Sequence, residues 1–270
     1  MRTALVTGAA GFVGRHMSAA LRQRGYTVAE CDIVDGWDAL DHFATDTRRY
    51  DLVVHAAASS PHRKAIDSEP QHLARNVELD AAMFDWAVRT GQGRVLYLSS
   101  CAALDDPDDY GWAKLTGERM AAAARRSMLP VTVVRPYSGY GEDQSELFPF
   151  RAFVERARRR EDPFTIWGDG SQVRDWIHIS DVVAGALAVA ESGSDDPVSL
   201  CTGVGTSMLE LAAMICHAAG YEPSFDLLPE HHAGSAYRVG DPTALHQVYV
   251  PKVDLAEGVR RALGVTAGAR

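Results

Sequence analysis

The feature that constrains the fold most is the glycine-spaced segment TGAAGFVG at residues 7–14. It directly follows an apolar run and opens an amphipathic stretch over residues 12–25. In such a segment Gly8 permits a tight turn, Gly11 lets the backbone approach a pyrophosphate, and Gly14 allows close packing of a helix on a strand. The N-terminus of the helix adds unpaired N–H groups and a positive dipole. The segment therefore predicts a strand–turn–helix unit that binds the phosphates of a dinucleotide.

Short apolar runs alternate with amphipathic stretches through the first half of the chain. The runs are almost continuously apolar, which is typical of strands covered on both faces. The stretch at 71–90 places apolar residues at spacings of three and four, namely Leu73, Val77, Ala81 and Phe84. Strands are expected at 3–7, 27–32, 52–56, 95–99 and 131–135, and helices at 12–25, 71–90 and 111–128. Repeated strand–helix–strand units predict the α/β class, as a Rossmann-type doubly wound parallel sheet.

The pattern changes after Pro136. A segment rich in turn-forming residues and a loop-and-strand segment are followed by predicted helices near 180–191 and 206–219. No low-complexity linker separates these parts, so we expect a smaller, mostly C-terminal substrate lobe packed against the sheet. The predicted dinucleotide-binding domain comprises residues 1–136 and about 177–203, and the predicted substrate lobe comprises about 137–176 and 204–270.

Composition narrows the range of partners. The 270 residues are 46% hydrophobic and 23% charged, as in ordinary globular proteins, and the net charge of −9 disfavours nucleic acid. Four widely spaced cysteines without a CxxC pair favour reduced thiols. We find no signal-peptide pattern and no apolar stretch of the roughly 18–20 residues that span a bilayer. We therefore expect a soluble cytoplasmic protein without a membrane partner and without a metal, because the adjacent His231 and His232 do not form a helical metal pair.

The second predicted strand ends at Asp32. A carboxylate at this position hydrogen-bonds a ribose 2′-hydroxyl and repels a 2′-phosphate, and no Arg or Lys lies between Gly25 and Asp46 to bind such a phosphate. The predicted cofactor is therefore NAD rather than NADP. Asp38 is a further candidate, for contact with adenine, although an exposed loop aspartate is an equally good interpretation.

The segment YGWAK places Tyr110 and Lys114 one helical turn apart on the same face. Bringing a phenol from its usual pKa near 10 to about 7 takes roughly 4 kcal/mol, and a neighbouring ammonium supplies much of it. The pair follows Ser99 and Ser100 at the carboxyl end of a predicted strand, where doubly wound sheets bind ligands. The pattern thus predicts a site of proton transfer.

Several motifs occur together along the chain. They are TGxxGxxG, Asp32, HAAA at 55–58, SS at 99–100, YxxxK at 110–114, RP at 135–136 and GDGSQVRDWIHISDVV at 168–183. Their combination resembles the extended short-chain dehydrogenase/reductase family, and more narrowly its NAD-dependent epimerase/dehydratase branch, which acts on nucleotide sugars. The resemblance covers residue 2 to about 263.

The resemblance implies roles for particular residues. Ser100 would hydrogen-bond the reacting oxygen, Tyr110 would remove or return its proton, and Lys114 would lower the pKa of Tyr110 and hold the nicotinamide ribose. The cofactor would contact Gly8, Gly11, Phe12, Val13, Asp32, Asp38, Ala56, Ala57, Ala58, Asn76, Ser99, Tyr110, Lys114 and Pro136. Members of the family often dimerise through helices that correspond to 71–90 and 111–128, so a homodimer is expected.

The predicted substrate site comprises Cys101, Tyr137, Arg174 and Arg238. Arg174 occupies the position that contacts a nucleotide diphosphate, and a guanidinium fork suits phosphate oxygens. A surface ion pair between Arg174 and Asp175 is the alternative interpretation.

Two departures from the family pattern bear on the reaction. Cys101 and Ala102 stand where the family's sugar 4,6-dehydratases carry an Asp-Glu pair, and the segment between Ser100 and Tyr110 is shorter than usual. Cys101 could serve as an acid, although a small buried thiol is the favoured interpretation. We therefore expect a nucleotide-sugar epimerase that oxidises a hydroxyl transiently. The alternatives are a dehydratase or net dehydrogenase/reductase of the same fold, and a catalytically silent dinucleotide sensor.

Overall fold

Six strands form the central sheet of the computed structural model, which describes residues 1–59, 71–104, 108–231 and 234–265. The strands are β1 (Arg2–Thr7), β2 (Tyr26–Cys31), β3 (Leu52–His55), β4 (Val95–Leu98), β5 (Val131–Pro136) and β9 (Val198–Leu200). Their order across the sheet is β2-β1-β3-β4-β5-β9, and the first five pair in parallel. The chain continues from β1 to β2 on one side, whereas β3 and the later strands lie on the other side of β1. The carboxyl end of β1 is therefore the switch point at which such sheets bind ligands.

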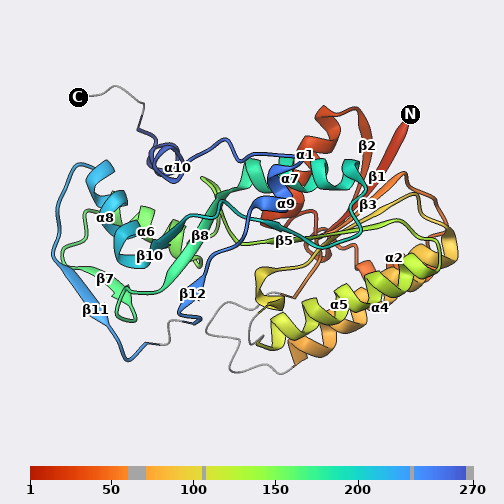
Figure 1. The fold of residues 1–270 in the computed structure, drawn as a ribbon, viewed down its shortest axis with the longest axis horizontal. Coiled ribbons are helices and arrows are strands. Elements are labelled where there is room, and N and C mark those ends of the chain that lie inside the picture. The colour runs from red at the N-terminus through yellow and green to blue at the C-terminus, as the bar shows by residue number, and fades with distance from the viewer. Residues whose placement is uncertain (60–70, 105–107, 232–233, 266–270) are drawn as a thin grey trace. The chain divides into compact units, whose positions relative to one another are not determined.

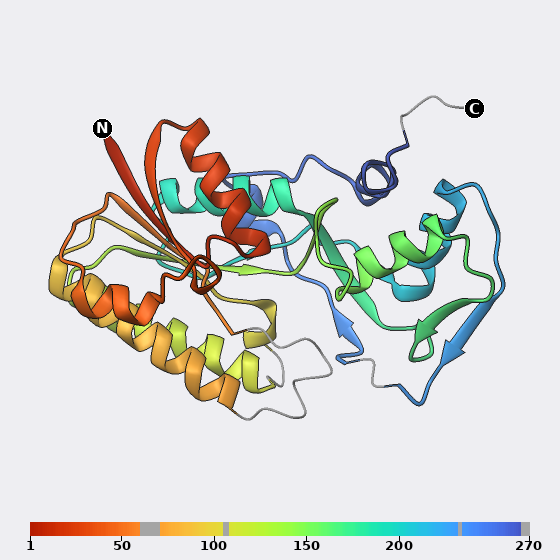
Figure 2. The same ribbon diagram turned by 180° about the vertical axis from the view of Figure 1, so that it is seen from behind.

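Helices cover both faces of this sheet (Figures 1 and 2). One face carries α1 (Phe12–Gln23) and the part of α7 (Ile179–Ser192) that follows Val183, and the other carries α2 (Ala39–Thr45), α4 (Gln71–Thr90) and α5 (Asp109–Arg126). All residues of β3 and β4 are buried, as expected for strands covered on both sides. The predicted doubly wound α/β fold is confirmed; α2 was not predicted.

The core beneath α2, α4 and α5 is aromatic and aliphatic. It includes Leu5, Phe43, Met83, Trp86, Tyr97 and Val133. The helix expected at 71–90 has the predicted ends, but its buried face was predicted wrongly in part. Ala81 is exposed, whereas the polar Asn76 and Asp80 are buried.

The chain divides into two compact units, Met1–Pro136 with Val183–Ser199 and Tyr137–Val182 with Leu200–Arg270. The second contains a sheet of β10 (Gly205–Ser207), β8 (Val173–His178) and β12 (Tyr237–Arg238), with β6 (Ser138–Tyr140) also paired to β8, and a pair of β7 (Phe164–Trp167) and β11 (Phe225–Leu228). Its helices are α6 (Pro149–Arg158), α8 (Met208–Ala218), α9 (Thr243–His246) and α10 (Leu255–Leu263). Its core includes Tyr140, Phe150, Phe164, Trp176, Leu211 and Val259.

No helix in the described part of the chain has the length and apolar character that a membrane crossing requires.

Candidate active site

The glycine-spaced loop lies between β1 and α1, at the switch point of the sheet. Gly8 has a φ of +69°, and a Cβ added to it would lie 2.6 Å from the backbone nitrogen of Ala57. A Cβ added to Gly14 would overlap the carbonyl oxygen of Gly8. The N–H of Gly11 donates to the Gly8 carbonyl at 3.0 Å and closes the turn. Only glycine fits at Gly8 and Gly14. The N-cap of α1 is Gly11, which has no side-chain oxygen to bind the first amides of the helix.

A cavity of about 250 Å³ opens beside this loop. Five of the residues predicted to contact a cofactor line it: Gly8, Asp32, Asp38, Ala57 and Ala58. Asp32 is fixed there because its carboxylate accepts hydrogen bonds from the N–H of Ala10 at 2.9 Å and of Val34 at 3.0 Å. Asp38 caps α2 through the N–H of Leu40, so it is a structural residue as well as a cavity residue. Among the lining residues that the sequence reasoning missed are Trp37, Ser59, Arg75 and Leu79.

A second cavity, of about 280 Å³, is lined by Trp37 and Asp38 among others. Arg48 lines it, but its Nε lies 3.0 and 3.1 Å from the two carboxylate oxygens of Asp46. This guanidinium is therefore already engaged by Asp46, whereas Arg75 lines the first cavity together with Asp32. His42 lies 3.0 Å from Asp46, and burial lowers the pKa of His42 despite the attraction of that carboxylate.

Two predicted cofactor residues instead have protein partners. The Asn76 side chain accepts from the N–H of Ser59 at 2.7 Å and donates to its carbonyl at 2.9 Å. The Ser99 hydroxyl donates to Glu118 at 2.6 Å, and Glu118 also forms a two-point ion pair with Arg135. These side chains hold the loop after β3 and the end of β4 in place.

Four further predicted cofactor residues lie in the segments at the carboxyl ends of the central strands and at the start of α1. Phe12 and Val13 form the first turn of α1, Ala56 adjoins Gly8, and Pro136 ends β5.

Tyr110 and Lys114 lie in the first turns of α5, where Asp108 caps the helix through the N–H of Gly111 at 2.8 Å. Lys114 is only 2% exposed, and its Nζ lies 5.8 Å from the centre of the Tyr110 ring. Burial raises the pKa of Tyr110, Lys114 lowers it, and the neighbouring acidic groups raise it further, so the net change is upward. The predicted influence of Lys114 has the right sign, and in the protein without a nicotinamide desolvation outweighs the ammonium.

A buried polar cluster behind Lys114 was missed by the sequence reasoning. Asp80 accepts a hydrogen bond from the Tyr97 hydroxyl at 2.5 Å and lies 3.1 Å from His55 Nε2. His55 Nδ1 in turn lies 2.8 Å from the hydroxyl of Thr7, the residue before Gly8. The sequence signals for this cluster were His55 in the HAAA motif and Asp80 within the predicted helix 71–90.

Ser100 follows β4 and caps the 3₁₀ turn Cys101–Ala103, accepting from the N–H of Ala102 at 3.1 Å. Its hydroxyl hydrogen remains a donor for a further acceptor. Cys101 is partly buried and acts electrostatically on Tyr110, so the turn faces the start of α5. Residues 105–107 of the shortened segment, and His232, lie outside the described residues.

The second unit brings two predicted substrate residues together. In the parallel pair of β12 and β8, Arg238 is the register partner of Arg174, and neighbouring strands lie about 4.8 Å apart. Arg174 is buried and donates to the carbonyl of Val173 at 2.8 Å. Asp175 is not a surface partner of Arg174. It is fully buried and accepts from the backbone N–H groups of Thr202 and Gly203, both at 2.8 Å.

Comparison with known proteins agrees with these features. The profile of the NAD dependent epimerase/dehydratase family matches residues 4–200. The chain belongs to this family. The resemblance inferred from the motifs is therefore confirmed. The relatives of the chain are enzymes.

Relatives of this epimerase/dehydratase family member span nearly its whole length. A dTDP-4-dehydro-6-deoxy-D-allose reductase from Streptomyces bikiniensis is 26% identical over 92% of this chain and 90% of its own. A putative UDP-glucose 4-epimerase from Methanocaldococcus jannaschii is 25% identical over 96% of both chains.

Solved structures share the fold. A UDP-glucose 4-epimerase from Thermotoga maritima, solved with UDP-glucose, superposes with a TM-score of 0.84 at 25% identity and covers 97% of both chains. MoeE5 in complex with UDP-glucose and NAD gives 0.83 at 25% identity over 98% of both chains.

Proposed function

We propose that this family member is an NAD-dependent epimerase of a nucleotide sugar. The observation that carries the proposal is the buried Lys114 ammonium beside Tyr110, in the same unit as the Gly8 loop. A phenol paired with an ammonium on a helix that follows the carboxyl end of a central strand suits proton transfer at a carbinol.

The first unit fits a dinucleotide. The loop at Gly8 and Gly14 has no room for side chains, the amides at the start of α1 suit a pyrophosphate, and Asp32 lies in the adjoining cavity as an acceptor for ribose hydroxyls. When bound, NAD supplies a hydride acceptor on its nicotinamide ring. Lys114 would hold the nicotinamide ribose.

In this proposal the protein's own groups bind the substrate and move one proton. Ser100 donates its hydroxyl hydrogen to the reacting oxygen, and Tyr110 takes the proton of the sugar hydroxyl as the carbinol is oxidised. Lys114 stabilises the phenolate form of Tyr110, which becomes the neutral phenol when it accepts this proton. The ketone then turns over, Tyr110 returns the proton when the opposite face is reduced, and the carbinol carbon is inverted.

The substrate class is suggested by the arginines of the second unit and by relatives. Arg174 and Arg238 form a doubly positive position on adjacent strands, which suits a diphosphate. Two structures of the same fold hold UDP-glucose. We therefore propose a nucleoside-diphosphate sugar, with UDP-glucose as the first substrate to test.

Arg174→Met is expected to raise KM for the nucleotide sugar by about 10- to 100-fold, because a charge-assisted hydrogen bond contributes about 1.5–3 kcal/mol. The kcat should change little, since the diphosphate does not react. Steady-state kinetics measure both. Arg159→Met is the control, because Arg159 is exposed and pairs with Glu161 at 2.9 Å. An unchanged KM in Arg174→Met would remove this arginine from the substrate site.

The function itself is tested by incubating the purified protein with NAD and with UDP-, dTDP- or GDP-hexoses. We expect a redox-neutral epimer, detected by proton NMR of the anomeric region, without accumulation of NADH at 340 nm. NADP should support the reaction poorly, because Asp32 repels a 2′-phosphate. NADH formed in proportion to product would instead indicate a net dehydrogenase. Tight NAD binding without turnover of any sugar would indicate a dinucleotide sensor.

Cys101 and Ala102 disfavour a dehydratase that needs an Asp-Glu pair, although the family includes dehydratases. A homodimer through α4 and α5, and a cytoplasmic location, stay predictions.

A further inference from the structure

The buried carboxylate of Asp80 has no part in the mechanism above. It lies on α4 and is 1% exposed, and a buried charge is costly unless partners compensate it. Both of its oxygens have partners. One lies 3.1 Å from His55 Nε2, and the other accepts a hydrogen bond of 2.5 Å from the Tyr97 hydroxyl. The carboxylate therefore has one fixed position, defined by β3, β4 and α4.

The Lys114 ammonium attracts this carboxylate and shares Tyr97 with it as a neighbour. Its Nζ is 5.0 Å from the ring centre of Tyr97, whose hydroxyl binds Asp80, and 5.8 Å from the ring centre of Tyr110. Burial raises the pKa of Asp80, but the attraction of Lys114, with the hydrogen bonds from His55 and Tyr97, lowers it overall. The ammonium thus acts electrostatically on both the Asp80 carboxylate and the phenol of Tyr110.

Gly117 shows that this close packing is built into α5. A Cβ at this position would overlap the Tyr97 hydroxyl and would lie 2.5 Å from the carboxylate of Asp80. A glycine inside a helix costs about 1 kcal/mol relative to alanine. Here the missing side chain makes the space that Asp80 and Tyr97 occupy.

We propose that Asp80 is a positioning residue of the Tyr110–Lys114 pair, whose carboxylate shares the Lys114 ammonium with Tyr110 and so sets the pH at which Tyr110 ionises. The inference rests on the proposed function, in which Tyr110 is the base. The charged groups that act most on Tyr110 are Lys114 on α5, Asp80 on α4, Cys101 after β4 and Asp108 at the cap of α5, and the titratable Tyr97 on β4 also interacts with it electrostatically. Lys114 favours the phenolate and the other three charged groups oppose it, so the charge of Asp80 adds to desolvation in raising the pKa of Tyr110.

The ionisation of Tyr110 can be measured without a substrate. With tyrosine labelled at the ring carbon that bears oxygen, carbon NMR follows each of the nine tyrosines of the chain, and Tyr110→Phe assigns the signal of Tyr110. Asp80→Asn removes the negative charge and keeps the shape of the side chain. We expect the titration midpoint of Tyr110 to fall by about one pH unit, the size typical of one nearby charge at a partly buried site.

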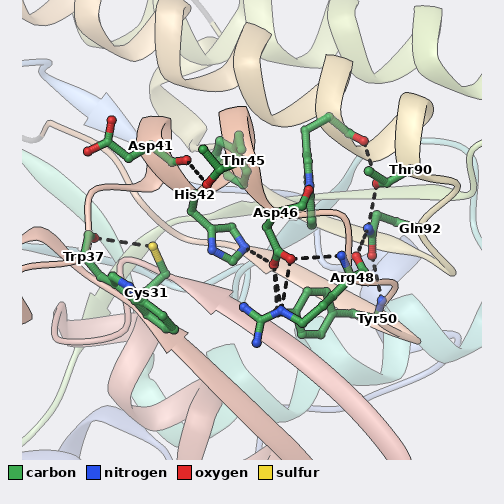
Figure 3. Close-up of polar contacts among 12 residues, drawn as sticks. Cys31, Trp37, Asp41, His42, Thr45, Asp46, Arg48, Tyr50, Thr90 and Gln92 are labelled. Atoms are coloured by element: carbon green, nitrogen blue, oxygen red, sulfur yellow. Dashed lines mark hydrogen bonds and ion pairs between the residues drawn. The ribbon is translucent and has the colours of Figure 1, made fainter.

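Asp46→Asn is the matched control. Asp46 also accepts from a tyrosine hydroxyl, that of Tyr50 at 3.1 Å, and lies 3.0 Å from a histidine, His42 (Figure 3). It is not among the charges named above for Tyr110, so Asp46→Asn should leave the midpoint of Tyr110 where it is in the wild type. A midpoint in Asp80→Asn that is unchanged, or that rises, overturns the proposal.

Asp80→Ser is a second neutral variant, for use if Asp80→Asn disturbs folding, and it should lower the titration midpoint of Tyr110 in the same way. It is neutral and leaves space for a water between His55 and Tyr97. The pH profile of kcat/KM gives a second readout, and its rising limb should move to lower pH by the same amount in either variant. If the NMR shift occurs but no nucleotide sugar turns over, the proposed function fails and the role of Asp80 stands. If the wild type turns over substrate and neither neutral variant shifts the midpoint, the role of Asp80 fails alone.

Discussion

Tyr110→Phe should lower kcat by about 10²- to 10⁴-fold, the usual contribution of a positioned acid or base. The substitution removes only a hydroxyl, and the ring that faces the Lys114 ammonium is kept. NAD affinity, measured by isothermal titration calorimetry, should therefore change by less than about tenfold, the equivalent of one modest hydrogen bond.

The pH dependence adds a second measure of this variant. Since burial raises the pKa of Tyr110 and Lys114 only partly offsets it, kcat/KM of the wild type should climb as pH rises through the neutral range. The residual activity of Tyr110→Phe should lack this limb. Tyr26→Phe is the matched control, because it also removes one phenolic hydroxyl. Among the described residues, the hydrogen-bond partner of this hydroxyl on β2 is the exposed Arg2. Full activity in Tyr110→Phe would contradict the mechanism.

Gly14→Ala should weaken NAD binding by about 5- to 150-fold. The new methyl group would overlap the Gly8 carbonyl, and overpacking of this kind costs about 1–3 kcal/mol. Backbone on both sides of the clash leaves no flexible side chain to move aside, so the loop between β1 and α1 must change shape. Calorimetric titration with NAD measures the loss, and thermal unfolding measures the accompanying loss of stability.

Gly139→Ala is the control for added volume at a glycine. A Cβ on Gly139 meets only a methyl carbon of Val182 at 3.7 Å, which is ordinary contact, so NAD affinity should be unchanged. Equal NAD affinity in the wild type and in Gly14→Ala would show that the cofactor does not depend on this loop.

Features of the fold and of the site that depend on residues close together in the sequence could be predicted. The turn at Gly8, the strand ends near Asp32 and Ser100, and the helical pairing of Tyr110 with Lys114 depend on spacing within a few residues. Both glycine positions that the loop requires follow from the same short motif.

Features that depend on tertiary packing were not predictable in this way. The apolar spacing of residues 71–90 predicted the helix α4 but not its buried face. In the structure Ala81 is exposed and Asp80 is buried, because Asp80 interacts with Lys114 and Tyr97 from distant parts of the chain. The upward net change in the pKa of Tyr110 has the same origin, since desolvation depends on everything packed around the ring. The register of Arg174 with Arg238 needed the pairing of β8 with β12.

Gly117 has a consequence for attempts to make this enzyme more heat-resistant. Replacing glycine by alanine within helices is a common way to raise a melting temperature, because it reduces the entropy of the unfolded chain. At Gly117 the added methyl group would strike Tyr97 and Asp80, so the usual gain should turn into a loss. A stabilised variant should therefore keep this glycine and take its alanine substitutions elsewhere.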